Sequence, residues 1–111
     1  MSDWTAVIAE VDLPEGKSTR VATDLGDLLV HRSGEKLFAI AVRCTHQGAP
    51  LDRGPVRIQT STQTVTCPAH GSVFDLETGR VMRGPATTPV AAYETRINDG
   101  AIEVRVRSED A

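Results

Sequence analysis

Hydrophobic and polar residues alternate along most of this chain with a period of two rather than the 3.6 of a helix. Near residue 100 the alternation is regular, with Ile102, Val104 and Val106 interleaved with Glu103, Arg105 and Arg107. Such a segment predicts a strand with one buried face and one wet face. The pattern as a whole predicts six strands, over residues 4–8, 18–22, 27–31, 36–42, 91–97 and 101–106.

Two of the segments between these strands have the composition of hairpin turns. Arg32-Ser33-Gly34-Glu35 separates the third and fourth expected strands, and Asn98-Asp99-Gly100 separates the last two. The second turn consists of residues that tolerate a positive φ. Because no segment has a helical apolar stripe, the sequence predicts an all-β fold, either a small barrel or a sandwich.

Composition limits the possible functions. A chain of 111 residues suits one domain with its own core, but no catalytic domain besides. No apolar run is long enough to span a membrane. The net charge of −3 gives no reason to expect nucleic-acid binding.

Two short runs concentrate the residues that bind metals. Cys44-Thr45-His46 and Cys67-Pro68-Ala69-His70-Gly71 contain both cysteines of the chain and two of its three histidines. Each run offers one thiolate and one imidazole, which indicates a metal centre with mixed sulfur and nitrogen ligands. The third histidine, His31, has no second candidate ligand near it in the sequence. We expect it on the polar face of a strand.

Other interpretations of the two runs remain open at this point. Free cysteines are often small buried hydrophobes, and a Cys44–Cys67 disulfide is a second alternative. The first residues show no basic region followed by an apolar region, so no export signal is visible, and we expect a cytoplasmic protein with reduced thiols. A Cys2His2 set also suits a structural zinc ion. The ligand spacing alone therefore does not distinguish zinc from an iron–sulfur cluster.

The residues around the two runs resemble the Rieske iron–sulfur family. The resemblance is carried by residues 44–51, residues 67–75 and Gly84-Pro85-Ala86-Thr87-Thr88-Pro89, which is similar to the family's proline-containing loop over the cluster. It covers about the middle two-fifths of the chain. The gap between the half-motifs is a few residues longer than usual, and we expect the extra length in the polar residues 59–64.

The resemblance implies a Rieske [2Fe-2S] cluster bound by Cys44, His46, Cys67 and His70. Both cysteines would bind the iron that stays ferric. Both histidines would bind the iron that is reduced, through Nδ1, with Nε2 left near the surface. The resemblance also implies a single Rieske domain over residues 1–111. Its barrel or sandwich base would comprise approximately residues 1–42 and 87–111, and an inserted cluster-binding subdomain would comprise approximately residues 43–86.

In function, the resemblance implies a one-electron carrier, a ferredoxin without its own catalytic site. Its partners would be a flavin-dependent ferredoxin reductase and the terminal oxygenase of a bacterial dioxygenase system, and the carrier itself would be a monomer. One alternative is a small Rieske subunit of a nitrite reductase or a similar complex. A zinc-stabilised binding module is another. The sequence does not name the reductase, the terminal acceptor or the final substrate.

The same resemblance bears on the reduction potential and on docking. Ala49 and Ala69 occupy the region where high-potential members carry two further cysteines. Ser72 matches a hydroxyl donor of those members, but Phe74 stands where they have a tyrosine. We therefore expect the lower part of the Rieske range, roughly −150 to 0 mV.

Residues 43–86 carry five arginines and three carboxylates, a net of +2, which leaves −5 for the rest of the chain. A basic cluster end tipped with Pro50, Leu51 and Pro85 would suit a neutral or acidic partner surface. The alternative is that these arginines are ordinary solvated loop residues.

Overall fold

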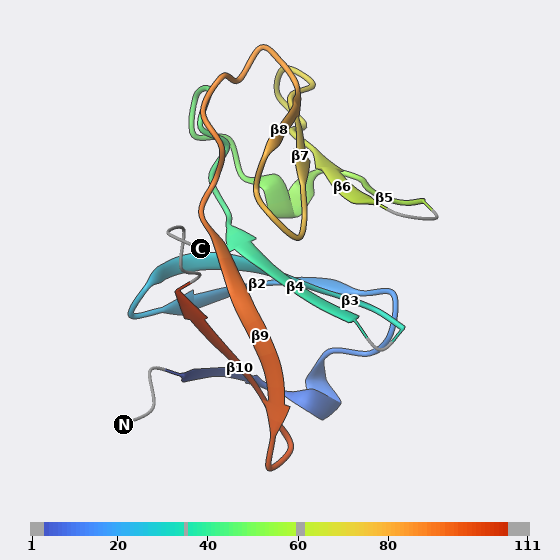
Figure 1. The fold of residues 1–111 in the computed structure, drawn as a ribbon, viewed down its shortest axis with the longest axis vertical. Coiled ribbons are helices and arrows are strands. Elements are labelled where there is room, and N and C mark those ends of the chain that lie inside the picture. Colours follow the sequence, from blue (N-terminus) through green and yellow to red (C-terminus); the bar gives the residue numbers. More distant parts are fainter. Residues whose placement is uncertain (1–3, 35, 60–61, 107–111) are drawn as a thin grey trace.

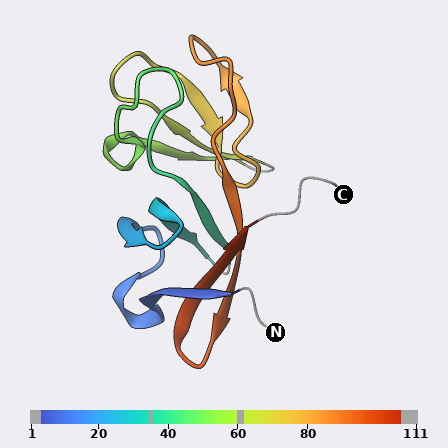
Figure 2. The same ribbon diagram turned by 90° about the vertical axis from the view of Figure 1, so that its left-hand side faces the viewer.

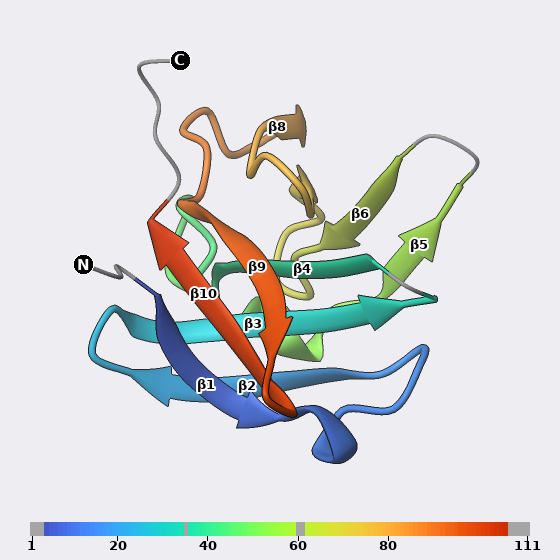
Figure 3. The same ribbon diagram turned by 60° about the horizontal axis from the view of Figure 1, so that its bottom comes forward.

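The computed structural model describes residues 4–34, 36–59 and 62–106, which form two antiparallel sheets (Figure 1). The six-stranded sheet has the order β1-β10-β9-β4-β3-β2. Its strands are β1 (Thr5–Ala9), β2 (Ser18–Thr23), β3 (Gly26–Ser33), β4 (Lys36–Ala41), β9 (Ala92–Asn98) and β10 (Ala101–Val106). Its edge strands β1 and β2 contact each other, so the sheet is a nearly closed barrel (Figure 3).

The four-stranded sheet has the order β5-β6-β7-β8 and lies between β4 and β9 in the sequence. Its strands are β5 (Val56–Ile58), β6 (Gln63–Thr66), β7 (Val73–Asp75) and β8 (Val81–Arg83). Two 3-10 turns, η1 (Glu10–Asp12) and η2 (Leu51–Arg53), are the only helical elements of the described residues. None of these helices is long and apolar enough to cross a membrane. The all-β prediction is confirmed.

All six predicted strands are present, and together they make up the six-stranded sheet. The bounds of β10 are those predicted, and the other strands differ at their ends by one or two residues. The four strands of the second sheet were not predicted. They contain only three or four residues each, which is too short for alternation to distinguish them from loops.

The two predicted turns lie where the sequence indicated. Asn98 pairs with Ala101, so Asp99 and Gly100 form a two-residue turn with φ values of 54° and 77°. Positive φ at both positions is the geometry that matches the twist of a hairpin. Ser33 pairs with Lys36, so Arg32 and Ser33 belong to β3 rather than to the turn. Glu35 lies outside the described residues, as do residues 60–61 of the polar stretch 59–64. The described part of that stretch joins β5 to β6, and Gln59 N donates to Thr62 O at 2.8 Å.

Two hydrophobic cores follow from this arrangement. The barrel core lies inside the six-stranded sheet and consists of Leu13, Leu28, Val30, Ala39, Ile102 and Val104. The inter-sheet core joins the two sheets, and Leu29, Ile40, Val65, Phe74, Cys44 and Cys67 belong to it. Figure 2 shows the four-stranded sheet standing over one side of the barrel. The segments that carry both cysteines are therefore anchored between the sheets.

The last strand differs from its prediction at one end. Ile102 and Val104 are fully buried, but Val106 is 64% exposed. Val106 pairs with Tyr93 of β9, but the described pairing of β10 with β1 begins at Val104, so no described residue of β1 lies opposite Val106. Arg107 lies outside the described residues.

The expectation for His31 was wrong, because the side chain is only 4% exposed. Leu28 and Val30 of β3 face the barrel core, whereas Leu29 faces the inter-sheet core, so this strand is covered on both faces. The His31 ring stacks on Phe38, and its Nδ1 lies 2.6 Å from Ser18 Oγ. Burial lowers the pKa of His31 from the ordinary 6.5, because desolvation disfavours the charged imidazolium.

Candidate metal centre

The two candidate ligand runs adopt the same backbone geometry. In the first loop (residues 44–48), Cys44 N donates to Ala49 O at 2.9 Å, and Gly48 N donates to Cys44 O at 2.7 Å. In the second loop (residues 67–71), Cys67 N donates to Ser72 O at 2.7 Å, and Gly71 N donates to Cys67 O at 3.1 Å. An equivalent pair of hydrogen bonds thus closes each loop directly around its cysteine.

Each loop ends in a glycine with a left-handed backbone. The φ angles are 78° at Gly48 and 82° at Gly71, a region that residues with a Cβ adopt only at a cost. The left-handed residue turns the chain back after the histidine. Both glycines therefore serve as turn residues of the ligand loops. Gly54, which follows η2, has by contrast an extended backbone with a φ of −92°.

The four candidate ligands separate into an inner pair and an outer pair. Cys44 and Cys67 are each 2% exposed, belong to the inter-sheet core and are free thiols. His46 and His70 are exposed, and their ring centroids lie 5.1 Å apart with the planes at 88°. The fold therefore brings sulfur donors together inside and nitrogen donors together at the surface.

A backbone amide lies close to one of the thiols. His46 N donates to Cys44 Sγ at a distance of 3.5 Å. A donor to sulfur stabilises added negative charge at a metal that the sulfur binds.

A third segment, the proline loop (residues 84–89), is bonded to both ligand loops. Thr45 Oγ1 donates to Thr88 O, 43 residues along the chain. Ala86 N donates to the fully buried Ser72 Oγ at 3.0 Å. The proline loop and Ser72 were expected from the sequence to lie near the cluster, but the hydrogen bonds of Thr45 and Ala86 were not predicted. The position of Thr45 between two candidate ligands, Cys44 and His46, was the one feature of the sequence that could have indicated its role.

The expected apolar tip needs one correction. Leu51 was placed there with Pro50 and Pro85, but it is fully buried in the inter-sheet core, because η2 turns its side chain inward. Pro85 is exposed and Pro50 is half-buried. The tip therefore consists of the two prolines and the two histidines.

The donor set fits a two-iron cluster better than a single ion. Rieske clusters take two thiolates on one iron and two imidazoles on the other. Among the described residues, no group of three or more His, Cys, Asp or Glu side chains is arranged around one metal position. A structural zinc site would need all four donors around one ion. The disulfide alternative is also inconsistent with the structure, in which both thiols are free.

Comparison with known proteins gives a consistent result. Residues 3–94 match the family of Rieske [2Fe-2S] domains. The chain is 35% identical over 98 residues to the 3-phenylpropionate/cinnamic acid dioxygenase ferredoxin subunit of Photorhabdus laumondii, covering 88% of this chain and 90% of that one.

Solved structures with the same fold include two carbazole 1,9a-dioxygenase ferredoxins. The Nocardioides aromaticivorans ferredoxin superposes with a TM-score of 0.84 at 29% identity, covering 96% of this chain and all of that one. A chain in a complex of reduced oxygenase and oxidised ferredoxin has a TM-score of 0.80 at 28% identity, with 98% of this chain and all of that one covered. A putative NADH-dependent nitrite reductase small subunit from Mycobacterium tuberculosis also superposes, with a TM-score of 0.80 at 25% identity over 95% of this chain and 96% of that one.

Proposed function

The chain belongs to the Rieske [2Fe-2S] family, and on that basis we propose that it is a one-electron carrier of an oxygenase system. The family's cluster, when bound, takes up and releases a single electron. The observation that carries the proposal is the separation of the donors, with two buried thiols and two adjacent exposed imidazoles.

We assign the ligands as two pairs. Cys44 and Cys67 would hold one iron of the cluster, and His46 and His70 would hold the other. The support is that the two cysteines share the inter-sheet core, whereas the two histidine rings lie side by side at the surface. Two imidazoles in place of two thiolates leave the oxidised centre formally neutral, so that adding an electron is electrostatically easier.

Each part of the chain has a distinct task in this function. The inter-sheet core excludes water from the sulfur ligands, and His46 N donates a hydrogen bond to the Cys44 sulfur. The proline loop holds both ligand loops in place. The exposed imidazoles bring the edge of the centre to the surface, where a partner protein can approach closely enough to exchange an electron.

The proposed partners are a flavin-dependent ferredoxin reductase and a terminal oxygenase. The relative from Photorhabdus is named a dioxygenase ferredoxin subunit, and one structural neighbour comes from a complex of oxygenase and ferredoxin. Both candidate-site histidines serve as ligands, which leaves no acid–base pair at the centre. We therefore propose a carrier with no catalytic site of its own.

Two further assignments complete the proposal. We assign the protein to the cytoplasm, on the strength of its two free thiols. We assign residues 43–86 to a cluster-binding subdomain inserted into a base formed by the rest of the single domain. The four-stranded sheet lies within that segment, which supports the division.

A nitrite reductase small subunit is the second candidate, favoured by the structural match at 25% identity. The dioxygenase ferredoxin match is higher, at 35% over 98 residues. The two candidates predict different electron acceptors. Reduced protein that reoxidises with a Rieske-type oxygenase, but not with a nitrite reductase large subunit, favours the first.

The test of the core proposal is an absorption and EPR spectrum of the purified protein before and after dithionite. A red-brown protein with a rhombic reduced signal, of lower average g than four-cysteine clusters show, is the expected result. A colourless protein with one zinc per chain would contradict it, provided that anaerobic reconstitution with iron and sulfide also failed.

A further inference from the structure

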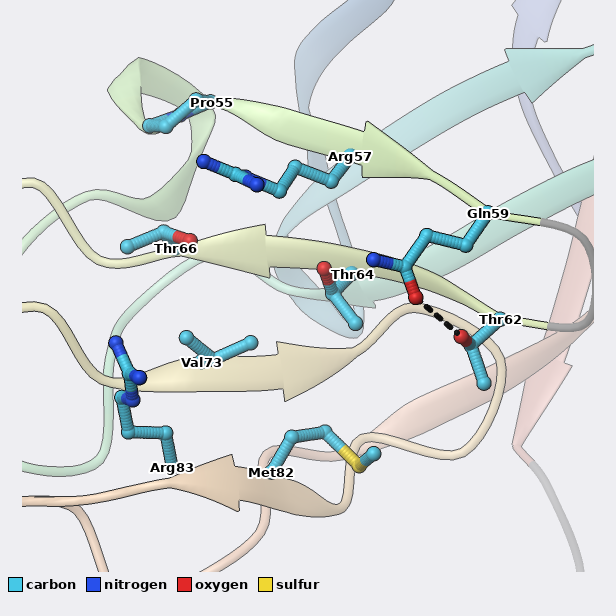
Figure 4. Close-up of a pocket in the computed structure, with 9 residues that line it drawn as sticks. All are labelled: Pro55, Arg57, Gln59, Thr62, Thr64, Thr66, Val73, Met82 and Arg83. Atoms are coloured by element: carbon cyan, nitrogen blue, oxygen red, sulfur yellow. Dashed lines mark hydrogen bonds between the residues drawn. The ribbon is translucent and has the colours of Figure 1, made fainter.

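The four-stranded sheet has one covered face and one open face. Val65 and Phe74 are fully buried and point into the inter-sheet core. Side chains on the opposite face form the outer groove, which encloses about 550 Å³. The groove is lined chiefly by Arg57, Thr64, Thr66, Val73, Met82 and Arg83 (Figure 4).

A bulge gives the groove an unusual wall on the β8 side. Val73 pairs with Arg83, but the next residue, Phe74, pairs with Val81, so Met82 is an additional residue in β8. Alternation would send Met82 and Arg83 to opposite faces. The bulge instead directs both side chains to the groove. One apolar and one cationic side chain thus lie next to each other on this wall.

The groove carries two cations without a counter-charge. Neither Arg57 nor Arg83 forms an ion pair or a side-chain hydrogen bond with any described residue. Asp75 is the nearest carboxylate by register, opposite Thr64. Its Oδ1 accepts from Glu77 N at 2.7 Å and from Thr78 N at 3.0 Å, so it is engaged in the turn after β7.

The charged end of the groove adjoins the candidate metal centre. Figure 4 shows both guanidinium groups on the side of Thr66, away from the end where Thr62 and Gln59 are hydrogen-bonded. Thr66 directly precedes Cys67, and Arg83 directly precedes Gly84 of the proline loop. A protein segment held there would sit beside the second ligand loop, which carries His70, and beside the proline loop.

We infer that the outer groove is a docking site for an acidic segment of the redox partner, whose carboxylates pair with Arg57 and Arg83. The inference rests on the proposed function, since it locates part of the partner's footprint. The charges are complementary, and Arg and Met are residue types enriched in protein interfaces. Three strand spacings separate β5 from β8, about 14 Å, which admits one extended segment.

The test uses a peptide of six glutamates with a far-red label, titrated against the holoprotein at low ionic strength by thermophoresis. Wild type is compared with Arg57→Gln/Arg83→Gln and with Lys17→Gln/Lys36→Gln. Both lysines are exposed and lie in the half of the molecule that contains the six-stranded sheet (the six-stranded half). This control therefore removes two positive charges away from the groove. We expect the groove variant to weaken binding roughly five- to tenfold. The control should stay within about twofold, since distant exposed charges are screened.

A second variant keeps both arginines. Thr64→Asp places a carboxylate on the groove floor beside Arg57, with which Thr64 is paired in register, and should weaken peptide binding to a similar degree. No binding by wild type, or equal loss in the groove variant and its control, would overturn the inference. Displacement of the peptide by equimolar inorganic phosphate would also overturn it, because the groove would then be a site for small anions.

The readout does not involve electron transfer, so this test and the spectroscopic test fail independently. A normal Rieske spectrum without peptide binding would contradict only the docking inference. Peptide binding by a protein that holds no cluster, even after reconstitution, would contradict the electron-carrier function and not the presence of an anionic-peptide site.

Discussion

The arginines of the two halves of the molecule differ in their ion pairing. In the six-stranded half, Arg20, Arg32, Arg96 and Arg105 each pair with a carboxylate. Arg96 and Glu103 are direct cross-strand neighbours, as are Arg105 and Glu94, and both arginines also stack over Trp4. In the four-stranded half, Arg57 and Arg83 have no such partner among the described residues.

The same contrast applies to the metal-binding residue types. His31 of the six-stranded half is buried, stacked on Phe38 and hydrogen-bonded to Ser18. His46 and His70 of the other half are exposed and contact each other. One half thus satisfies its polar groups internally, as a scaffold does. The other half presents them to a cofactor or a partner.

Histidine substitutions should give the largest difference between the halves. His46→Ala removes an imidazole from the exposed pair, and we expect complete loss of the Rieske-type EPR signal of the dithionite-reduced protein. His31→Gln alters the histidine of the scaffold and should leave the signal at full intensity. Spectra of both variants at matched protein concentration check this. A rhombic signal of wild-type intensity in His46→Ala would remove this residue from the ligand set.

Glycine substitutions should reduce the free energy of unfolding by different amounts in the two halves, because the glycines differ in how closely they are packed. A Cβ on Gly54 would lie 1.8 Å from Thr66 O, so Gly54→Ala must displace backbone, and we expect a loss of about 3 kcal/mol of unfolding free energy. A Cβ on Gly34 meets nothing within 4 Å, so Gly34→Ala should cost only about 1 kcal/mol for its positive φ of 62°. Denaturant unfolding of the holoproteins measures both. Equal losses would show that the backbone at Gly54 moves aside freely.

The serines of the two halves should differ in their effect on the reduction potential. Ser72→Ala leaves the buried amide of Ala86 without its acceptor, which costs about 1–3 kcal/mol of stability. Ser72 Oγ accepts the bond from Ala86 N, so its own proton stays free to donate to the cluster, as the hydroxyl that Ser72 matches does in high-potential members. Loss of one such donor should lower the reduction potential by about 40 mV. Ser18→Ala removes the partner of His31 and should affect stability alone.

Voltammetry of these serine variants provides the measurement, with wild type expected between roughly −150 and 0 mV. A wild-type potential well above roughly +100 mV would contradict the assignment to the lower Rieske range. A shift in Ser18→Ala as large as that in Ser72→Ala would contradict the division between the halves.

The smallest effect concerns pH and His31. Burial lowers the folded-state pKa of His31 below 6.5, so the unfolded state binds a proton more readily than the folded state. The contribution of His31 to stability should therefore be complete above about pH 6.5 and should be lost progressively as the pH drops toward the lowered folded-state pKa. Unfolding between pH 5 and 8 measures this slope, and His31→Gln should reduce it. An unchanged slope in that variant would assign the effect to other groups.

The sequence predicted the scaffold well because its strands are long enough to show alternation. The five to eight residues of each strand in the six-stranded sheet contain several apolar–polar repeats. The three residues of β7 contain one at most. Burial of His31 could not be predicted, because the face of β3 that carries it is covered by the second core, which forms only through long-range packing.

The candidate ligands were identified from their flanking residues, and the structure adds how they are held. The bonds from Thr45 to Thr88 and from Ala86 to Ser72 join segments 43 and 14 residues apart. No local pattern indicates such contacts. Likewise the outer groove depends on a bulge at Met82, which no pattern in the sequence between Val81 and Arg83 indicates.

The strand order also determines which parts of the molecule can form first during synthesis. The barrel strand β4 pairs with β9, whose residues follow the whole four-stranded half in the chain. A ribosome adds about 5–20 residues per second, so Cys44, His46, Cys67 and His70 all leave it seconds before Ala92 can join Ile40. The proline loop is made after all four residues and before Ala92, so it can join the two ligand loops only in the last part of that interval. The six-stranded sheet is therefore completed only after all four candidate ligands and the proline loop have been made.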